Sequence, residues 1–162
     1  RAAVRRERVP ILPIAKRLAT TFAQRAEERG GTVEVIEPMA TPIGDPTLLE
    51  ELLINLVDNA LNYGRPDVPP RVCIAAICLG DTVKLSVSDN GVGIPEDQRE
   101  RIFEVFTRLP GTDAEQGTGI GLAIVRKAAR SMGSDVTVES EVGAGTAFSV
   151  LLPCAEDRPP RS

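Results

Sequence analysis

Residues 50–63, with the sequence EELLINLVDNALNY, are the stretch that most constrains how this chain can fold. At helical spacing the apolar residues form one broad arc that needs burial, and the polar residues gather in a narrow stripe opposite. The stripe consists of Glu51, Asn55, Asp58, Asn59 and Asn62. Asparagine costs roughly 0.6 kcal/mol against alanine inside a helix, so three of them on one stripe require a compensating role. Amide oxygens beside a carboxylate suit Mg²⁺, and a solvated face is the alternative.

Composition limits the classes of protein to which the chain can belong. With 162 residues and 42% hydrophobic content, we expect one domain with a substantial core. The net charge of −4 and the aromatic content of 3% argue against nucleic acid as a partner. The sequence contains no histidine, which excludes a Ser-His-Asp triad, a His-ligated zinc site and a phospho-histidine acceptor within these residues.

The three cysteines and the apolar runs indicate a cellular compartment. Cys73, Cys78 and Cys154 lack metal-site spacing, and we expect buried thiols in a reducing compartment. The reducing compartment favours a cytoplasmic location, and because no apolar run is long enough to span a membrane, we expect no membrane contact by these residues. The chain begins with Arg1, which suggests a fragment of a longer protein, and a membrane anchor in that parent stays open.

The periodicity predicts an α+β domain at residues 9–153, after a linker or the end of a preceding helical domain at 1–8 and before a disordered tail at 154–162. Helices are predicted over 11–29, 45–63, 95–106 and 119–132, and strands over 32–36, 71–79, 82–89, 135–139 and 146–152. Asp45 followed by Pro46 is a typical helix start.

Asp89 and the two glycines that follow it form a candidate ligand site. Alternation along the strand 82–89 directs the Asp89 carboxylate toward the core, where it needs a strong hydrogen-bond donor. Gly91 and Gly93 would let a flat ligand approach the backbone, and the exocyclic amine of a purine is a suitable donor. A hairpin turn at Asn90-Gly91 is the alternative, weakened by the helix predicted directly after it.

A second glycine-rich stretch leads into the helix predicted over 119–132. It consists of Gly117, Thr118, Gly119, Ile120, Gly121 and Leu122. Glycines before a helix N-terminus expose N–H groups that bind phosphate, although the spacing is neither that of a Walker loop nor that of a Rossmann fingerprint. A flexible hinge is the alternative.

The order of these motifs closely resembles the catalytic and ATP-binding domain of sensor histidine kinases, within the gyrase, Hsp90, histidine kinase and MutL ATPase superfamily. The matching residues are Glu51, Asn55, Asn59, then Asp89-x-Gly91-x-Gly93, then Phe103-x-x-Phe106, then Gly117-x-Gly119-x-Gly121. The resemblance runs from about residue 11 to residue 153. It implies a Bergerat-type two-layer sandwich, with a mixed, mostly antiparallel sheet of about five strands on three helices and a mobile ATP lid over 107–116.

The resemblance also implies roles for the site residues. Asn55 and Asn59 would hold Mg²⁺ and the phosphates, Tyr63 would lie beside the nucleotide, and Asp89 would accept a hydrogen bond from the adenine amine. Gly91 and Gly93 would shape the adenine pocket, and residues 117–122 would line the phosphate end and the hinge of the lid.

Further residues have two interpretations each. Arg108 would neutralise phosphate charge or form a surface ion pair, and Phe103 and Phe106 would support the lid or pack in the core. Gly143 and Gly145 match another family motif, but a hairpin turn is the favoured interpretation. Asn62 stands where the family commonly has a lysine that reaches the phosphates, and Arg65 is a candidate replacement.

The implied reaction is transfer of the γ-phosphoryl group of ATP to a histidine on a separate helical dimerisation domain. Glu51 would polarise that acceptor or, in the ATPases of the superfamily, a water molecule. The parent would be a homodimer that acts on a response regulator in a later step. The alternatives are an ATPase or a serine kinase of the same superfamily, or a non-catalytic nucleotide-binding module.

Overall fold

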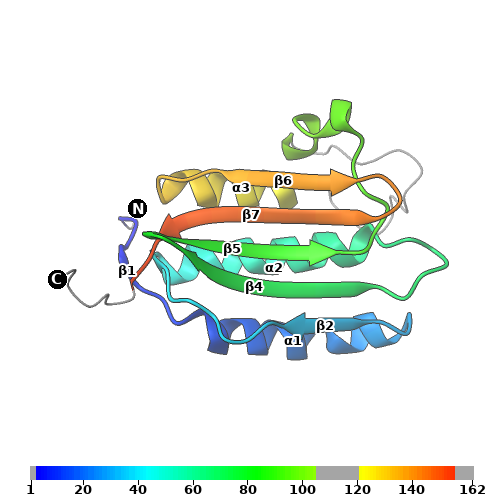
Figure 1. Ribbon diagram of the computed structural model, residues 1–162, viewed down its shortest axis with the longest axis horizontal. Coiled ribbons are helices and arrows are strands. Elements are labelled where there is room, and N and C mark those ends of the chain that lie inside the picture. The colour runs from blue at the N-terminus through cyan, green and yellow to red at the C-terminus, as the bar shows by residue number, and fades with distance from the viewer. Residues whose placement is uncertain (1–2, 105–120, 156–162) are drawn as a thin grey trace.

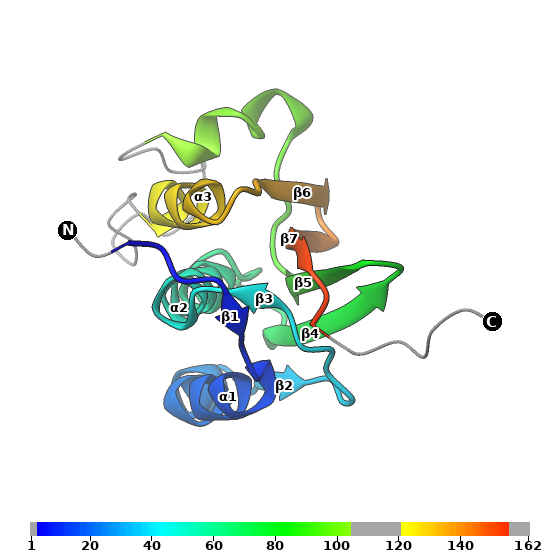
Figure 2. The same cartoon turned by 90° about the vertical axis from the view of Figure 1, so that its left-hand side faces the viewer.

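The computed structural model describes residues 3–104 and 121–155, and these form two layers (Figure 1). One layer is a five-stranded sheet in the order β2-β4-β5-β7-β6, formed by β2 (Thr32–Val35), β4 (Arg71–Leu79), β5 (Thr82–Asp89), β6 (Val136–Glu141) and β7 (Gly145–Pro153). The β2–β4 pair is parallel and the other pairs are antiparallel. The other layer consists of α1 (Ile11–Glu27), α2 (Pro46–Asn62) and α3 (Gly121–Ser131), which cover one face of the sheet (Figure 2). The predicted α+β fold is confirmed.

The helix α2 lies between α1 and α3 and contacts β4 and β5 (Figure 2). Its apolar arc, Leu49, Leu52, Leu53, Leu56 and Val57, is at most 1% exposed. Burying one such side chain stabilises a fold by about 1.5–3 kcal/mol, so this arc sets how α2 is rotated about its axis. The predicted helix and its burial are confirmed.

Asp45 caps the N-terminus of α2, as the sequence predicts. Its Oδ1 accepts hydrogen bonds from the backbone N–H groups of Thr47 and Leu48, at 2.9 and 3.2 Å. Its Oδ2 accepts a third from the backbone N–H of Arg5, at 2.9 Å. The bond from Arg5 is the largest cause that lowers the pKa of Asp45, and it outweighs the opposing effect of burial.

The hairpin predicted from residues 71–89 forms with the predicted bounds, but the helix predicted over 95–106 is wrong for the residues that the structure describes. Two short 3₁₀ turns, η1 (Glu96–Gln98) and η2 (Arg101–Phe103), replace it. Ile102 is the one fully buried residue in these turns. A helix there would gain too little from packing to offset the cost of ordering it.

Two features differ from the sequence-based expectation in smaller ways. The segments β1 (Glu7–Arg8) and β3 (Ile43–Gly44) pair in a small antiparallel sheet that no strand signal indicated. None of the three cysteines is fully buried as expected: Cys73 and Cys154 are half-buried, and Cys78 is exposed because it lies in the last, exposed residues of β4. In the described ranges 3–104 and 121–155, no helix is long and apolar enough to cross a membrane.

Replacing Asp45 by alanine is expected to lower the free energy of unfolding by about 1–2 kcal/mol, because the cap of α2 is lost. Since the folded-state pKa of Asp45 is lowered, its stabilisation is present above the ordinary value of 3.8 and is lost as the pH falls through the lowered value. Urea unfolding at about pH 7 and about pH 3 measures both effects. The exposed Asp67→Ala is the control, and an equal effect of the two substitutions would contradict the role of the cap.

Candidate functional site

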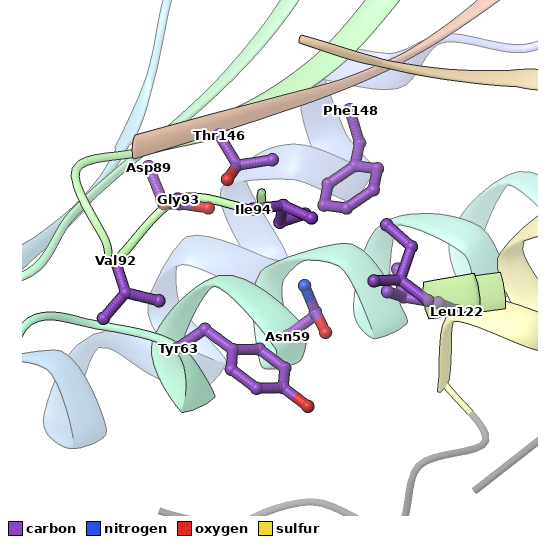
Figure 3. Close-up of a pocket in the computed structure, with 10 residues that line it drawn as sticks. Asn59, Tyr63, Asp89, Val92, Gly93, Ile94, Leu122, Thr146 and Phe148 are labelled. Carbon is purple, nitrogen blue, oxygen red and sulfur yellow. The ribbon is translucent and has the colours of Figure 1, made fainter. Parts of the chain in front are cut away.

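A pocket opens where α2, α3, β7 and the segment after β5 meet (Figure 3). It is lined by Asn59, Tyr63, Asp89, Val92, Gly93, Ile94, Ile102, Leu122, Thr146 and Phe148. Asp89 and Thr146 lie on the sheet side, and Asn59 and Tyr63 project from α2 on the other side (Figure 3). A mostly apolar cleft with a few polar groups suits a flat, partly polar ligand.

The Asp89 carboxylate is the charged group of this pocket. It stands at the end of β5, opposite Val72 on β4 and Thr146 on β7. It accepts a hydrogen bond of 2.8 Å from the backbone N–H of Gly91, and another from the backbone of Thr146. Burial raises the pKa of Asp89 to about 6 although both N–H groups lower it. The carboxylate is therefore ionised at neutral pH and able to accept a further hydrogen bond from a ligand.

The two glycines after Asp89 allow the chain to pack against its own backbone. A Cβ on Gly91 would lie 2.3 Å from the carbonyl oxygen of Tyr63. Gly93 has φ of +76°, and a Cβ there would lie 2.2 Å from the carbonyl oxygen of Glu141. The backbone N–H of Val92 also donates to the Tyr63 carbonyl at 3.0 Å. The segment after β5 is thus held between the end of α2 and the β6–β7 turn, with Gly93 at the pocket wall.

The polar stripe of α2 divides into two parts, and the first faces the pocket and α3. Asn59 lines the pocket. The Nδ2 of Asn55 donates to the carbonyl oxygen of Glu51 at 2.8 Å, and its Oδ1 lies 3.3 Å from where a Cβ on Gly121 would be. The asparagine motif therefore meets the last glycine of the second glycine-rich stretch. The side chain of Glu51 is exposed and outside the pocket lining.

The second part of the stripe, Asp58 and Asn62, contacts α1. Arg25 of α1 forms an ion pair with Asp58 at 2.5 Å and donates a hydrogen bond to Oδ1 of Asn62. Neither Asp58 nor Asn62 lines the pocket. Arg65, the candidate replacement for a lysine, donates from Nε to the carbonyl oxygen of Asn90 at 2.9 Å. The hydrogen bond to Arg25 thus gives Asn62 a role in the contact between α1 and α2. Arg65 stabilises the loop before β4.

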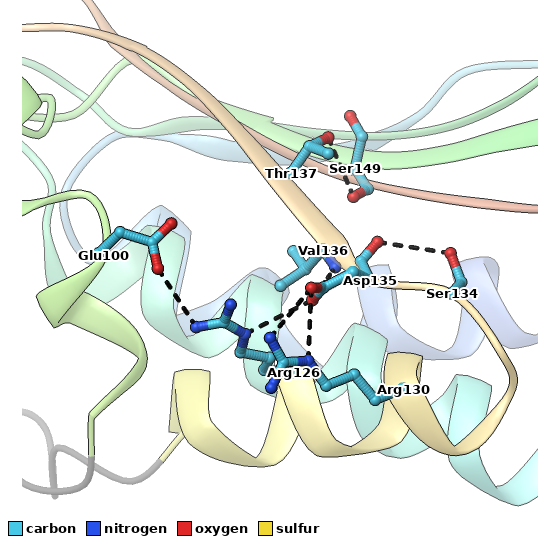
Figure 4. Close-up of polar contacts among 8 residues, drawn as sticks. All are labelled: Glu100, Arg126, Arg130, Ser134, Asp135, Val136, Thr137 and Ser149. Carbon is cyan, nitrogen blue, oxygen red and sulfur yellow. Dashed lines mark hydrogen bonds and ion pairs between the residues drawn. The ribbon is translucent and has the colours of Figure 1, made fainter.

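Arg126, in the middle of α3, links this helix to η2 and to the residue before β6. This side chain forms ion pairs with Glu100 and Asp135, both at 3.5 Å (Figure 4). Its guanidinium group lies 5.1 Å from the centre of the Phe103 ring, which packs edge to face on Phe148. Phe103 therefore packs at the border of the core, one of its two predicted roles.

The sequence-predicted site residues fall into three groups. The pocket brings together Asn59, Tyr63, Asp89, Gly93 and Leu122, with Asn55 and Gly121 in contact beside it. Glu51 and Gly91 lie outside its lining. Phe106, Arg108, Gly117, Thr118, Gly119 and Ile120, and the predicted lid, lie outside the described residues.

The sequence analysis missed several residues that line the pocket. They are Val92, Ile94, Ile102, Thr146 and Phe148. Alternation along the last strand is a signal that could have placed Phe148 on the inner face, whereas the position of Thr146 opposite Asp89 depends on the register between β5 and β7. Gly145 has φ of +142°, and a Cβ there would lie 2.0 Å from the carbonyl oxygen of Asp89. The structural interpretation of Gly145 holds, and this close approach brings Thr146 to the pocket.

Comparison with known families and curated proteins agrees with this geometry. Residues 44–156 match the family described as histidine kinase-, DNA gyrase B-, and HSP90-like ATPase. Cyanobacterial phytochrome A of Nostoc sp. strain PCC 7120 is 37% identical over 130 residues, which are 80% of this chain and 17% of that protein. The chain thus spans a small part of this longer relative.

Solved structures share the fold. Full-length ShkA in complex with AMPPNP superimposes with a TM-score of 0.76 at 31% identity, over 96% of this chain and 32% of that chain. The mycobacterial sensor histidine kinase MprB superimposes with a TM-score of 0.76 at 26% identity, over 91% of this chain and 98% of that chain.

Replacing Asp89 by asparagine is expected to change how stability depends on pH. Because burial raises the folded-state pKa to about 6, the contribution of Asp89 is most favourable below the ordinary value of 3.8 and is lost as the pH rises through about 6. Relative to wild type, Asp89→Asn should gain on the order of 2 kcal/mol between about pH 4 and about pH 7. Denaturant unfolding at both pH values measures this difference. The exposed Asp67→Asn should show no such trend, and a pH-independent effect of Asp89→Asn would refute the shifted pKa.

Proposed function

Since the chain belongs to the histidine kinase-, DNA gyrase B-, and HSP90-like ATPase family, we propose that it is the ATP-binding catalytic domain of a sensor histidine kinase. The observation that carries the proposal is the partly buried Asp89 carboxylate in an apolar pocket whose opposite wall presents Asn59 and Tyr63. The relatives support it, because ShkA was solved with AMPPNP and MprB is a sensor histidine kinase.

Adenine is the base that fits the pocket best. The ionised Asp89 carboxylate accepts a hydrogen bond from the exocyclic amine, and its two backbone donors hold it in place. Val92, Ile94 and Phe148 supply apolar surface for the faces of the ring. Guanine carries a carbonyl oxygen where adenine carries the amine, so the carboxylate disfavours it.

In this proposal Asn55 and Asn59 hold the phosphates and Mg²⁺. They are one helical turn apart on α2, and their amide oxygens are the hard donors that Mg²⁺ prefers alongside phosphate oxygens. Asn55 contacts Gly121, where α3 begins and where backbone N–H groups without helical partners favour an anion. Mg²⁺ would supply charge neutralisation on the phosphates. Residues 117–120 and Arg108 remain predicted contributors outside the described residues.

The proposed reaction transfers the γ-phosphoryl group of ATP to a histidine on a separate dimerisation domain of the parent chain, leaving ADP. This sequence contains no histidine, so the acceptor must come from elsewhere. Phosphoryl transfer depends mainly on positioning and charge neutralisation. A neutral imidazole is already a nucleophile, so no strong base is required. The exposed Glu51, one turn from Asn55, can polarise the acceptor.

The proposal also includes the location, assembly and downstream partner of the parent protein. The parent is a cytoplasmic or membrane-anchored homodimer whose phosphohistidine supplies a response regulator. This domain itself needs no contact with nucleic acid or with a membrane.

Nucleotide binding tests the site. Isothermal titration with Mg-ATP at about pH 7.5 should show Asp89→Asn weakened about 10- to 100-fold, the range expected for losing a hydrogen bond to a charged group. Wild-type affinity should fall as the pH drops below about 6, because Asp89 becomes protonated. Asn59→Ala should weaken Mg-ATP more than it weakens adenosine.

The matched control is Asn62→Ala, on the same helix but bound to Arg25. It should keep wild-type affinity. Equal losses in Asn59→Ala and Asn62→Ala, or full binding by Asp89→Asn, would show that the site is wrongly placed.

Phosphotransfer tests the reaction. When the histidine-bearing domain of the parent is supplied with Mg-ATP, wild type should form an acid-labile phosphoprotein, and Asn55→Ala should lower the initial rate at least tenfold, as expected for losing a metal and phosphate ligand. Hydrolysis of ATP without labelled acceptor would indicate an ATPase of the same family. Nucleotide binding with neither product would indicate a non-catalytic module.

A further inference from the structure

Two thiols from opposite halves of the chain meet at the end of the sheet remote from the pocket. Cys78 lies near the end of β4 and Cys154 directly follows β7. Their Sγ atoms are 3.6 Å apart. Asp89 stands at the other end of β5, whereas Cys78 pairs with Val83 near its beginning. This is also the end of the sheet at which the chain enters and leaves the fold (Figure 1).

The backbone holds the two cysteines in this position. Leu152 pairs with Val83, the residue that also pairs with Cys78, so β5 sets the register of both strands. The backbone N–H of Cys154 donates to the carbonyl oxygen of Asp81, in the β4–β5 turn, at 2.8 Å. The backbone of Cys154 also pairs with that of Pro42 in an isolated antiparallel β-bridge. The proximity of the thiols therefore follows from the sheet and not only from their side-chain rotamers.

We propose that Cys78 and Cys154 form a reversible intramolecular disulfide when the domain is oxidised by a peroxide. Cys78 is the exposed partner and reacts first: its thiolate attacks one peroxide oxygen, the O–O bond breaks, and a sulfenic acid and one water form. The Cys154 thiolate then attacks the sulfenic sulfur, the S–O bond breaks, and the hydroxide leaves as a second water. Two thiols thereby lose two electrons and two protons, and hydrogen peroxide is reduced to two waters.

The local structure permits the small movement that the bond requires. A disulfide has an S–S distance of about 2.05 Å, so the sulfurs must approach by roughly 1.5 Å. Cys78 lies two residues before Gly80, which has φ of +64° and, apart from its own chain neighbours, no atom within 4 Å of where a Cβ would be. Gly80 and Asp81 are both exposed, so the turn can shift without displacing core residues.

The third cysteine provides an internal control. Cys73 lies on β4 opposite Ser88, near the pocket end of the strand. Burial raises the pKa of its thiol, and the nearby Glu34 carboxylate raises it further. Less thiolate forms at Cys73 than at a cysteine with the ordinary pKa, so Cys73 should react slowly with peroxide.

The disulfide would join the ends of β4 and β7 beside the N-terminal segment. There the backbone N–H of Val9 donates to the Pro42 carbonyl, and Arg8 donates to the Ala155 carbonyl, both at 2.9 Å. Oxidation would therefore add a covalent link between β4 and the residue after β7, next to the hydrogen bonds that hold the N-terminal segment. The nucleotide pocket at the far end of the sheet is not part of the link.

The test uses the 162-residue chain, fully reduced, diluted and treated with hydrogen peroxide. Intact mass under non-reducing conditions should show a monomer lighter by two hydrogen atoms, and peptide mapping should show Cys78 linked to Cys154. Dithiothreitol should reverse both. Cys73→Ser should form the same link, whereas Cys78→Ser and Cys154→Ser should lose it completely.

Each variant is first checked for its circular dichroism spectrum and for binding of Mg-ATP, so that misfolding is not mistaken for loss of the link. In Cys154→Ser the sulfenic acid at Cys78 should accumulate and react with dimedone. A link that contains Cys73, crosslinks only between molecules, or oxidation of Cys78 past the sulfenic stage in wild type would overturn the proposal. These outcomes are independent of whether the domain transfers phosphate.

Discussion

Burial of the apolar arc of α2 is the constraint on which the rest of the structure depends. Leu49, Leu52, Leu53, Leu56 and Val57 pack against the sheet and the neighbouring helices, and this fixes the rotation of α2 about its axis. With the rotation fixed, each polar residue can face only one neighbour. Asn55 and Asn59 face α3 and the pocket, whereas Asp58 and Asn62 face Arg25 on α1.

The pocket is formed by the well-packed helix α2 on one side and by Asp89 on the other, whose buried charge lowers the stability of the fold. The β5–β7 register brings Asp89 opposite Thr146, and the close approach at Gly145 leaves no room for a side chain there. Burial of the Asp89 carboxylate raises its pKa to about 6, so keeping it ionised at neutral pH costs stability. A residue that weakens the fold but completes a hydrogen-bonding site is typical of functional positions, where stability is exchanged for binding.

Much of the fold could be predicted because its signals are local. Asp45 before Pro46 marked the start of α2, and the two strands on either side of Gly80 followed from alternation and a turn signal. The helix expected over 95–106 is replaced by two short turns in the described residues 95–104, because Ile102 is the one buried residue of these turns and a continuous helix would gain too little from burial. The exposure of Cys78 was missed because alternation predicts which face a residue occupies, but not where the covering layer ends.

The sequence by itself determined the main helices and the five strands of the large sheet, the candidate residues and the family they resemble, since helix caps, turns and spaced motifs are properties of short segments. Only the tertiary structure decided which residues of the polar stripe of α2 face the pocket. Arg25, which is distant in sequence, forms an ion pair with Asp58 and a hydrogen bond with Asn62, so these two residues face α1 instead. It also decided that Thr146 and Phe148 complete the pocket and that Cys78 meets Cys154. These contacts depend on strand register and helix rotation, which are set by the packing of the whole core rather than by neighbouring residues.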